Sequence, residues 1–359
     1  MTIHIFNPEH EHALAANLTN FTPPHAARQL RSDLAFFPAL WADDGDAVIV
    51  EDISSAESAY RKLKLQHRAA VRFVTVSDVP RLVLSSGDIT VRPWGWDATI
   101  CAALRRAGIP EKALPSVEML AELRALSNRS LAVDLLKQLT SISGTTGQSL
   151  VCNSVEEVMQ QLAEWKSVVV KAPWSCSGRG IRYLTPENAT ENVIQWMRNI
   201  LRQQHSLIVE RKCQRVADFA VEYYANADGT VGQSGLSLFS TVNGAYTGNL
   251  LDTEEHKREE LGKYIPLSLL DTVTAQASEY LADRIKGMYT GPFGIDMMIV
   301  AGDGADAAHP FLLNPCIEIN MRRTMGHAAL ALSDGGQRGI MNIAYENKQY
   351  KVKLTNDIL

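Results

Sequence analysis

The first third of the chain alternates short apolar runs with amphipathic segments, and this alternation constrains the fold more than any other feature. The apolar runs are strand candidates at 3–6, 47–50, 72–76 and 89–91. The segments between them, which include 23–42 and 54–67, have the apolar spacing of helices. Strands that alternate with helices predict a parallel α/β sheet, whose ligand crevice lies at the loops that follow the strands.

The pattern changes after residue 110, so we expect a domain boundary between 110 and 128. A helical pattern over 114–139 begins with Ser116 as its N-cap and is interrupted at 126–130. Farther along, strands and helices mix with hairpin turns such as the one at 227–231, and a long amphipathic helix follows over 267–288. The sequence therefore predicts an N-terminal α/β domain followed by an α+β part.

Length and composition limit the classes of protein to which the chain can belong. A chain of 359 residues is too long for one ordinary core, which predicts two or three domains. The net charge is −5 and there is no long basic run, which argues against a nucleic-acid partner because phosphate binding needs clustered Lys and Arg. Five scattered cysteines predict reduced thiols. No apolar stretch approaches about 20 residues and the N-terminus has no signal core, so we expect no membrane segment and a cytoplasmic location.

The stretch VVVKAPWSCSGRG, residues 168–180, indicates a phosphate site. Lys171 ends an apolar strand, and a loop rich in serine and glycine follows it, which is the reverse of the order in a Walker loop. The backbone N–H groups and hydroxyls of such a loop can bind phosphates while the lysine supplies charge; an incidental surface turn is the alternative. The candidate loop residues are Ser175, Ser177, Gly178, Arg179 and Gly180.

Two further segments are candidates for nucleotide contacts. Glu210 ends a strand, and a short link through Arg211 and Lys212 leads to the next strand, so exposed backbone there can pair with an adenine edge. Asp218 stands at the start of that next strand and can accept hydrogen bonds from a ribose. Solvated charges at strand ends are the alternative.

Acidic side chains also stand inside apolar strands downstream. Asp296 lies in the middle of one strand, and Glu318 and Asn320 share one face of another. Carboxylates in such strands are costly without a cation, and this set of oxygen ligands suits Mg²⁺; an ordinary charged strand face is the alternative. Arg322 follows on the same face, where it can meet a phosphate or a developing negative charge.

In this order, these pieces resemble the ATP-grasp superfamily over roughly residues 110–330. The resemblance implies an ATP-grasp fold in which ATP lies between two sheets, preceded by a Rossmann-like α/β domain. The implied domains are 1–112, 113–205 with the phosphate loop, and 206–359 with the hinge and the magnesium site. The matched residues are Lys171 as the phosphate lysine, Ser175–Gly180 as a covering loop that closes as a lid, Glu210–Lys212 as the adenine hinge, Asp218 as the ribose acid, Asp296, Glu318 and Asn320 as the metal ligands, and Arg322 as the phosphate arginine.

One position departs from the pattern of the superfamily. Where the family often has a second lysine before a helix, this chain has Arg129, which keeps the charge but not the compact ammonium. Lys137 competes for the same role. The identity of the second phosphate cation therefore stays open between these two residues.

The resemblance implies an ATP- and Mg²⁺-dependent ligase, with Mn²⁺ as an alternative metal, that joins a carboxylate to an amine or thiol through an acyl phosphate. Lys171, Arg129 and Arg322 would neutralise phosphate charge, since positioning and electrostatics dominate such chemistry. A small-molecule kinase and a non-catalytic nucleotide-binding module remain the alternatives. The expected partners are small carboxylate and amine substrates, and a homodimer is left open.

Three segments are candidates for contacts with the acceptor substrate. They are the histidine-bearing loop after the first strand, the segment RPWGWD, and the polar segment 240–249. The two histidines could instead bind a metal if they stood on a strand, and tryptophans often serve packing alone. The candidate residues are His10, His12, Arg92, Trp94, Asn243, Tyr246 and Asn249.

Overall fold

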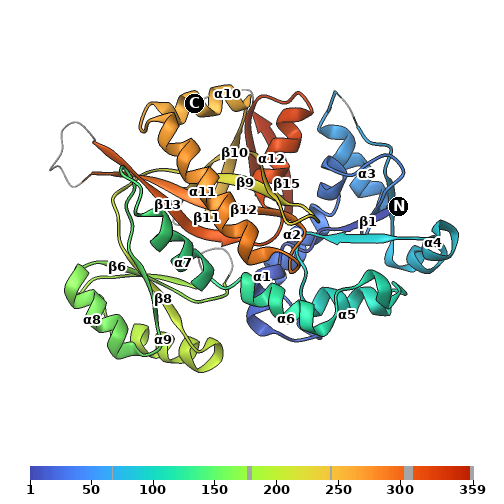
Figure 1. The fold of residues 1–359 in the computed structure, drawn as a ribbon. Coiled ribbons are helices and arrows are strands. Elements are labelled where there is room, and N and C mark those ends of the chain that lie inside the picture. The colour runs from blue at the N-terminus through green and yellow to red at the C-terminus, as the bar shows by residue number, and fades with distance from the viewer. Residues whose placement is uncertain (67, 176–179, 243–244, 303–309, 356–359) are drawn as a thin grey trace. The chain divides into compact units, whose positions relative to one another are not determined.

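The computed structural model of the chain (Figure 1) describes every residue except 67, 176–179, 243–244, 303–309 and 356–359. The chain divides into two compact units. Unit 1 comprises residues 1–124, 247–253 and 322–359, and unit 2 comprises residues 125–246 and 254–321. The predicted domain ranges 1–112, 113–205 and 206–359 remain a prediction.

Unit 1 contains a four-stranded parallel sheet in the order β3-β2-β1-β4. Its strands are β1 (Thr2–Ile5), β2 (Ala47–Ile49), β3 (Arg72–Val74) and β4 (Thr90–Pro93). They coincide with the four apolar runs of the N-terminal third, and the buried core beneath them includes Ile3, Ala47 and Val91. The predicted α/β class, with a parallel N-terminal sheet, is confirmed.

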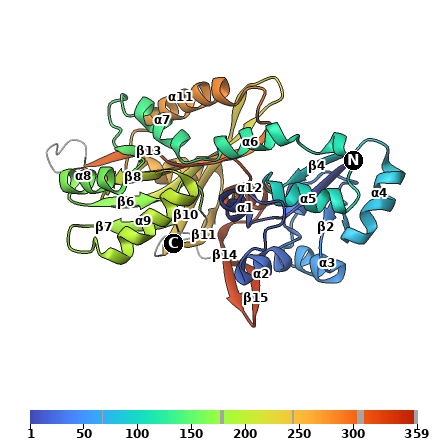
Figure 2. The same ribbon diagram turned by 90° about the horizontal axis from the view of Figure 1, so that it is seen from below.

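Helices follow the strands of unit 1, as the alternating pattern predicts. The segment 23–42 is not one helix, because it divides at Phe36 into an α-helix and a 3₁₀ turn with Pro38 in its first turn. A C-terminal hairpin completes the unit, and Figure 2 shows its strands β14 and β15 side by side. The elements are α1 (His10–Ala16), α2 (His25–Asp33), η1 (Phe37–Leu40), α3 (Ile53–Lys62), η2 (Val76–Asp78), α4 (Val79–Ser86), α5 (Ala98–Arg106), η3 (Glu111–Ala113), α12 (Met325–Asp334), β14 (Gly339–Glu346) and β15 (Gln349–Thr355).

Two elements cross the boundary between the units along the chain. Helix α6 (Val117–Leu126) begins after Ser116, whose hydroxyl accepts a hydrogen bond from Met119 N at 3.2 Å, as the predicted N-cap requires. Strand β11 (Ala245–Leu251) pairs with β14 from Gly248 onward. The predicted interruption at 126–130 is confirmed, because α7 (Ser130–Leu139) starts as a separate helix.

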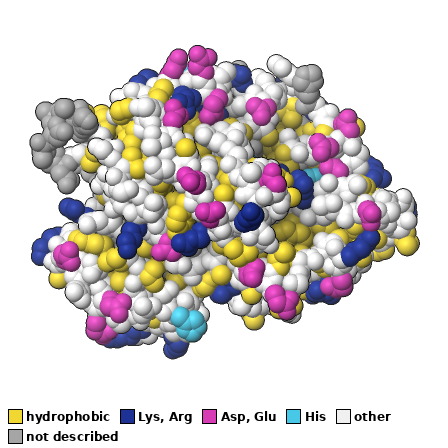
Figure 3. All heavy atoms as spheres, viewed as in Figure 1, with side chains coloured by type: hydrophobic (Ala, Val, Ile, Leu, Met, Phe, Trp, Pro, Cys, Tyr) yellow, Lys and Arg dark blue, Asp and Glu magenta, His cyan; other side chains and the backbone are white. Residues whose placement is uncertain are grey.

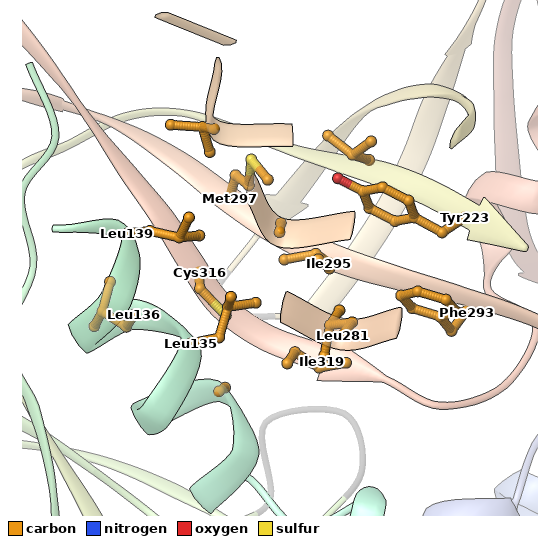
Figure 4. Close-up of a cluster of buried hydrophobic side chains, with 14 of the residues drawn as sticks. Leu135, Leu136, Leu139, Tyr223, Leu281, Phe293, Ile295, Met297, Cys316 and Ile319 are labelled. Carbon is orange, nitrogen blue, oxygen red and sulfur yellow. The ribbon is translucent and has the colours of Figure 1, made fainter. Parts of the chain in front are cut away.

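The larger sheet of unit 2 is antiparallel, in the order β13-β12-β9-β10. Its strands are β9 (Arg215–Ala225), β10 (Val231–Val242), β12 (Gly291–Ala301) and β13 (Phe311–Asn320). One face packs against α7 and α11 (Leu267–Ile285), and Figure 4 shows Leu135 and Leu139 of α7 beside Cys316, with Tyr223 and Phe293 nearby. The alternate residues of the same strands place their side chains on the opposite face.

The smaller sheet of unit 2 is also antiparallel, in the order β5-β8-β6-β7. Helices α8 (Val155–Trp165) and α9 (Glu191–Gln204) cover one face of it, where Val168, Val170 and Val209 are buried. Ser154 caps α8 by accepting from Glu157 N, as predicted. The strands are β5 (Ser149–Cys152), β6 (Val168–Lys171), β7 (Ile181–Leu184) and β8 (Leu207–Arg211), and α10 (Glu254–Gly262) completes the unit.

Two further observations concern the helices and the surface charge. Within the described part of the chain, no helix combines the length and the apolar character that a membrane crossing requires. Figure 3 shows acidic and basic side chains interspersed on the face in view, without one large patch of a single sign.

Candidate functional site

Lys171, at the end of β6, is held by a carboxylate of the neighbouring strand. Its ammonium lies 2.6 Å from Glu210 Oε1, and only 5 % of its side chain is exposed. In the register of the sheet, Val169 is opposite Glu210, so Lys171 and Glu210 form a diagonal pair on one face. This face is opposite the one that α8 and α9 cover, since Val168 and Val170 point the other way.

The same lysine also links the two sheets of unit 2. Its Nζ donates a 3.3 Å hydrogen bond to the carbonyl oxygen of Ile317 on β13. The side chain therefore brings the end of β6 next to the strand that carries the predicted metal ligands. A lysine in this position can present positive charge between the two sheets.

The predicted adenine hinge lies at the end of β8. Glu210 is directed to Lys171, whereas Arg211 and Lys212 are exposed. Lys212 donates its backbone N–H to Ser167 O at 3.0 Å, and its ammonium lies 5.9 Å from the centre of the Tyr183 ring. The exposed Tyr183 ring therefore lies near the predicted hinge, and the Glu210 side chain of the hinge is already ion-paired with Lys171.

The loop that follows Lys171 is described only at its two ends. Ser175 and Gly180 approach each other so closely that a Cβ on Gly180 would overlap the Ser175 side chain. Gly180 O also accepts a hydrogen bond from Ala172 N at 2.8 Å. Cys176, Ser177, Gly178 and Arg179 lie outside the described residues, and with them most of the predicted phosphate loop.

Arg129 lies at the N-terminus of α7 and is bound to both sheets. Its Nη1 donates to Ala172 O at 2.6 Å and to the hydroxyl of Ser175 at 2.8 Å. Its Nη2 donates to Ser175 O at 3.3 Å and to Glu318 Oε1 at 2.6 Å. The residue is 7 % exposed, whereas its competitor Lys137 is exposed on the same helix.

The predicted metal ligands share one face of the larger sheet. Asp296 of β12 is directly opposite Glu318 of β13, and Asn320 is opposite Gly294, two residues from Asp296. Side chains at these positions lie on the same face, opposite the core that α7 and α11 cover. The strand register therefore brings Asp296, Glu318 and Asn320 together on one face, as the sequence spacing predicted.

A bulge in β13 accompanies this arrangement. Between the pairs Asp296–Glu318 and Met298–Asn314, three residues of β13 face the single residue Met297 of β12. The three are Pro315, Cys316 and Ile317, and the proline has no N–H for the ladder. The bulge contains the Ile317 carbonyl that accepts from Lys171.

The donor set on this face fits Mg²⁺ in its chemistry. Like charges directly opposite each other on neighbouring strands destabilise a sheet, and the Arg129 guanidinium offsets one of the two carboxylates. Two carboxylates and an amide oxygen are hard ligands of the kind that Mg²⁺ prefers. Among the described residues, no group of three or more His, Cys, Asp or Glu side chains has a metal-binding arrangement. The predicted metal site therefore needs the amide oxygen of Asn320 in addition to the two carboxylates.

Strand β9 adds two acidic residues to the same face. Asp218 is opposite Met298 and accepts hydrogen bonds from Arg215 and from the hydroxyl of Thr241, at 2.8 and 3.1 Å. Glu222, opposite Gly294, is 1 % exposed and was not predicted. Its position four residues after Asp218 on one strand is the sequence signal that places both on one face.

Unit 1 brings together the loops after β1 and β4, two neighbouring strands of the parallel sheet. The Asn7 side chain donates to Gly95 O at 2.8 Å and accepts from Gly95 N at 3.3 Å. Asp97 lies 3.0 Å from His10 Nδ1, and both side chains are 3 % exposed. The histidine loop and the WGWD segment therefore form one buried network at the carboxyl edge of the sheet.

His10 and His12 lie in helix α1, not on a strand. Residues two apart on a helix diverge, which disfavours the alternative of a shared metal. The His10 ring packs so closely against Gly95 that a Cβ there would lie 2.5 Å from Cδ2 of the ring. A glycine at position 95 is therefore part of the same network.

Arg322 forms an ion pair with Glu11 of α1, through Nε and Nη2. The next residue, Arg323, donates its backbone N–H to Trp94 O and stacks 4.4 Å from the centre of the Trp41 ring. Trp94 itself is 5 % exposed and contacts Phe6 edge-on at 5.0 Å, so it packs in the core. Arg92 is exposed on β4.

The segment 240–249 is described only in part. Asn243 lies outside the described residues. Tyr246 and Asn249 both belong to β11, and Asn249 is 1 % exposed opposite Met341 of β14. The role of this segment in acceptor binding remains a prediction.

The described buried cysteines carry neutral thiols. Burial raises the pKa of Cys101 to about 12 and that of Cys152 to about 11. Burial likewise raises the pKa of Cys316 far above its usual value, and Cys316 packs in the core against α7. A thiolate nucleophile requires a lowered pKa, so these residues serve packing.

No family model matches the chain, and no curated protein matches it. Several solved structures do. An N5-carboxyaminoimidazole synthetase from Staphylococcus aureus, complexed with ADP, is 12 % identical with a TM-score of 0.49, over 96 % of this chain and 82 % of that one. A biotin carboxylase from Campylobacter jejuni is 13 % identical with a TM-score of 0.49, over 98 % and 73 %. An L-amino acid ligase from Bacillus licheniformis is 12 % identical with a TM-score of 0.47, over 91 % and 70 %.

These similarities are distant, and with TM-scores below 0.5 they carry no argument about reaction or substrate. The evidence for the fold comes from the sheets of the chain. Two antiparallel sheets, one ending in Lys171 and one bearing Asp296 and Glu318, follow an N-terminal parallel α/β sheet. The predicted mixed α/β fold, in which antiparallel sheets follow a parallel N-terminal sheet, is confirmed.

Proposed function

We propose that the chain is an ATP- and Mg²⁺-dependent ligase that joins a small-molecule carboxylate to an amine or a thiol. One observation carries the proposal. Lys171 of one sheet donates to Ile317 of the other, within a residue of Glu318, and Glu318 is directly opposite Asp296. A buried cation and two facing carboxylates thus converge where the predicted phosphates of ATP would need both.

In the proposed reaction, a carboxylate oxygen of the substrate attacks the γ-phosphorus of ATP, and the bond to ADP breaks. The amine or thiol then attacks the carbonyl carbon of the acyl phosphate, loses its proton, and phosphate leaves. Such a reaction depends on positioning and charge neutralisation. It needs no side-chain nucleophile, in keeping with the raised pKa values of the buried cysteines.

The residues of unit 2 would have separate roles in this reaction. Lys171 would bind phosphate oxygens, since a lysine has three donors and its ammonium uses one for Glu210 and one for Ile317. Asp296, Glu318 and Asn320 would hold Mg²⁺, which supplies positive charge to phosphate oxygens when bound. The exposed hinge at Arg211 and Lys212 would lie along the adenine.

The residues of unit 1 are proposed to bind the acceptor. The Asn7–Gly95 and His10–Asp97 pairs fix the loops at the carboxyl edge of its parallel sheet, where α/β sheets bind ligands. Arg322 is ion-paired with Glu11 there, so a substrate anion would compete with Glu11 for this guanidinium.

The test is acceptor-dependent ADP release by the full chain with ATP and Mg²⁺, screened over amino acids and small carboxylic acids. Asp296→Asn and Glu318→Gln should each lower the release by about 100-fold or more, because a charged ligand of the proposed Mg²⁺ is lost. The control is Glu279→Gln, which removes an exposed carboxylate from α11. Unchanged ATP–Mg²⁺ binding and release in both variants would refute the site, and a stable phosphorylated acceptor would identify a kinase.

A further inference from the structure

The contacts of Arg129 bear on its predicted role as the second phosphate cation, for which Lys137 is the competitor. Arginine has five N–H donors and no acceptor. Two donors of Arg129 bind Ala172 O and the Ser175 hydroxyl, and two bind Ser175 O and Glu318 Oε1. The fifth, on Nε, is buried without a hydrogen-bond partner among the described residues. No outward donor is left for a phosphate unless one of these bonds breaks.

The backbone of Arg129 reinforces the same connection. Its N–H donates to Pro173 O at 3.2 Å, so main chain and side chain both hold the segment 172–175. Helix α7, which Arg129 begins, packs Leu135 and Leu139 against the larger sheet. Arg129 therefore joins three elements: the segment after Lys171, the helix α7, and the carboxylate of Glu318.

We propose that Arg129 is a positioning residue that sets the separation between the end of β6 and Glu318. Through this bond network it places Lys171 and the carboxylates on the two sides of the nucleotide site. The purpose given to that separation, which is to hold a nucleotide, rests on the proposed function. The bond network of Arg129 does not depend on it. Arginine suits the role because its planar fork binds several acceptors in fixed directions, which a lysine ammonium cannot do.

The test compares Arg129→Lys, which keeps the charge and loses the fork, with Arg129→Gln, which loses both. Hydrogen–deuterium exchange over 170–175 is measured on the protein without nucleotide, and ATP binding is then measured with Mg²⁺. We expect both variants to exchange about 10-fold faster in this segment, because a network of buried hydrogen bonds is lost. We also expect both to bind ATP–Mg²⁺ more weakly than the wild type, within about 3-fold of each other.

The control variant is Arg198→Lys, which removes the fork from an exposed ion pair with Glu191 on α9 and should change neither readout. Glu318→Gln removes the negative charge that Arg129 binds at the other end of the network and should also speed exchange over 170–175. Unchanged exchange in the Arg129 variants, with Arg129→Lys binding ATP like the wild type and Arg129→Gln at least 10-fold weaker, would overturn the inference. Because exchange is measured without nucleotide, it decides the positioning role even if ATP binding fails in every variant.

Discussion

The two units hold their charged side chains in different ways. In unit 1, Asp97 accepts hydrogen bonds from the Asn7 amide and the Ile100 backbone and lies against His10, so the groups hold one another. In unit 2, Asp296 and Glu318 face each other across neighbouring strands, and the cations near them come from other elements. A closed network fixes a conformation, whereas two facing carboxylates depend on positive charge from other elements, which Arg129 supplies to Glu318.

This difference separates the expected effects of substitution. Changes in the unit 1 network should lower the free energy of unfolding and leave nucleotide binding intact. Changes around the facing carboxylates should act mainly on nucleotide binding. Each of the following substitutions tests one side of that division.

Asp97→Ala should have the largest effect on stability, about 3 kcal/mol or more. It removes an N-cap, worth about 1 kcal/mol, and leaves buried donors of Asn7 and His10 without their acceptor. Asp52→Ala is the matched control, because Asp52 caps α3 from an exposed position and its hydrogen bonds to described residues are with Ser54 and Ser55 of the same helix. Denaturant unfolding measures both; equal losses in the two variants would show that the buried network adds nothing beyond the cap.

Lys171→Met should weaken ATP–Mg²⁺ binding by roughly 10- to 100-fold, the equivalent of about 1.5–3 kcal/mol for a hydrogen bond to a charged group. Lys263→Met is the control, since Lys263 forms an exposed pair with Glu260. Calorimetry of ATP with Mg²⁺ gives the two affinities. If Lys171→Met binds ATP like the wild type, the lysine serves only its contacts with Glu210 and Ile317.

Gly95→Ala should destabilise the chain by about 1–3 kcal/mol, the usual cost of overpacking, because the added Cβ meets the buried His10 ring. Nucleotide binding should not change. Gly232→Ala in β10 is the control, because its Cβ would meet no atom within 4 Å. A Gly95 variant with wild-type stability and weaker ATP binding would contradict the division between the units.

The smallest expected effect is on pH dependence. Burial lowers the pKa of His4 in the folded chain, with Asp46 as its ring partner. A lowered pKa contributes stability above the unfolded value of 6.5, and this stability is lost as the pH falls through the folded pKa. His4→Gln should therefore flatten the stability profile below pH 6.5 by at most about 1.4 kcal/mol per pH unit. An unchanged profile in the variant would show that His4 does not titrate in this range.

The sequence predicts the elements of this chain better than it predicts their pairings. Local periodicity and caps located the parallel strands of unit 1, the break before α7 and the cap at Ser154, because these depend on neighbouring residues. The shared face of Glu318 and Asn320 follows from the two-residue period of a strand. Glu222 lies on the same face but was missed, although the same period applies to it.

Contacts between distant segments could not be predicted in this way. Arg129 and Glu318 are 189 residues apart, and their ion pair depends on how α7 packs on β13. The same holds for Lys171 with Ile317, and for Asn7 and His10 with the segment after β4. In the sequence, the family resemblance offered Arg129 as the second phosphate cation, with Lys137 as its competitor. Its four acceptors make Arg129 a candidate for positioning.

The bulge in β13 has a further consequence for how this strand tolerates changes in length. Three residues, Pro315 to Ile317, face one residue of β12, so the strand carries an even excess of two. Removing one of them would shift the parity of everything that follows and turn Glu318 and Asn320 toward the core that α7 covers. Removing two residues would keep Glu318 and Asn320 on their present face. In this strand, deleting two residues should therefore disturb the structure less than deleting one.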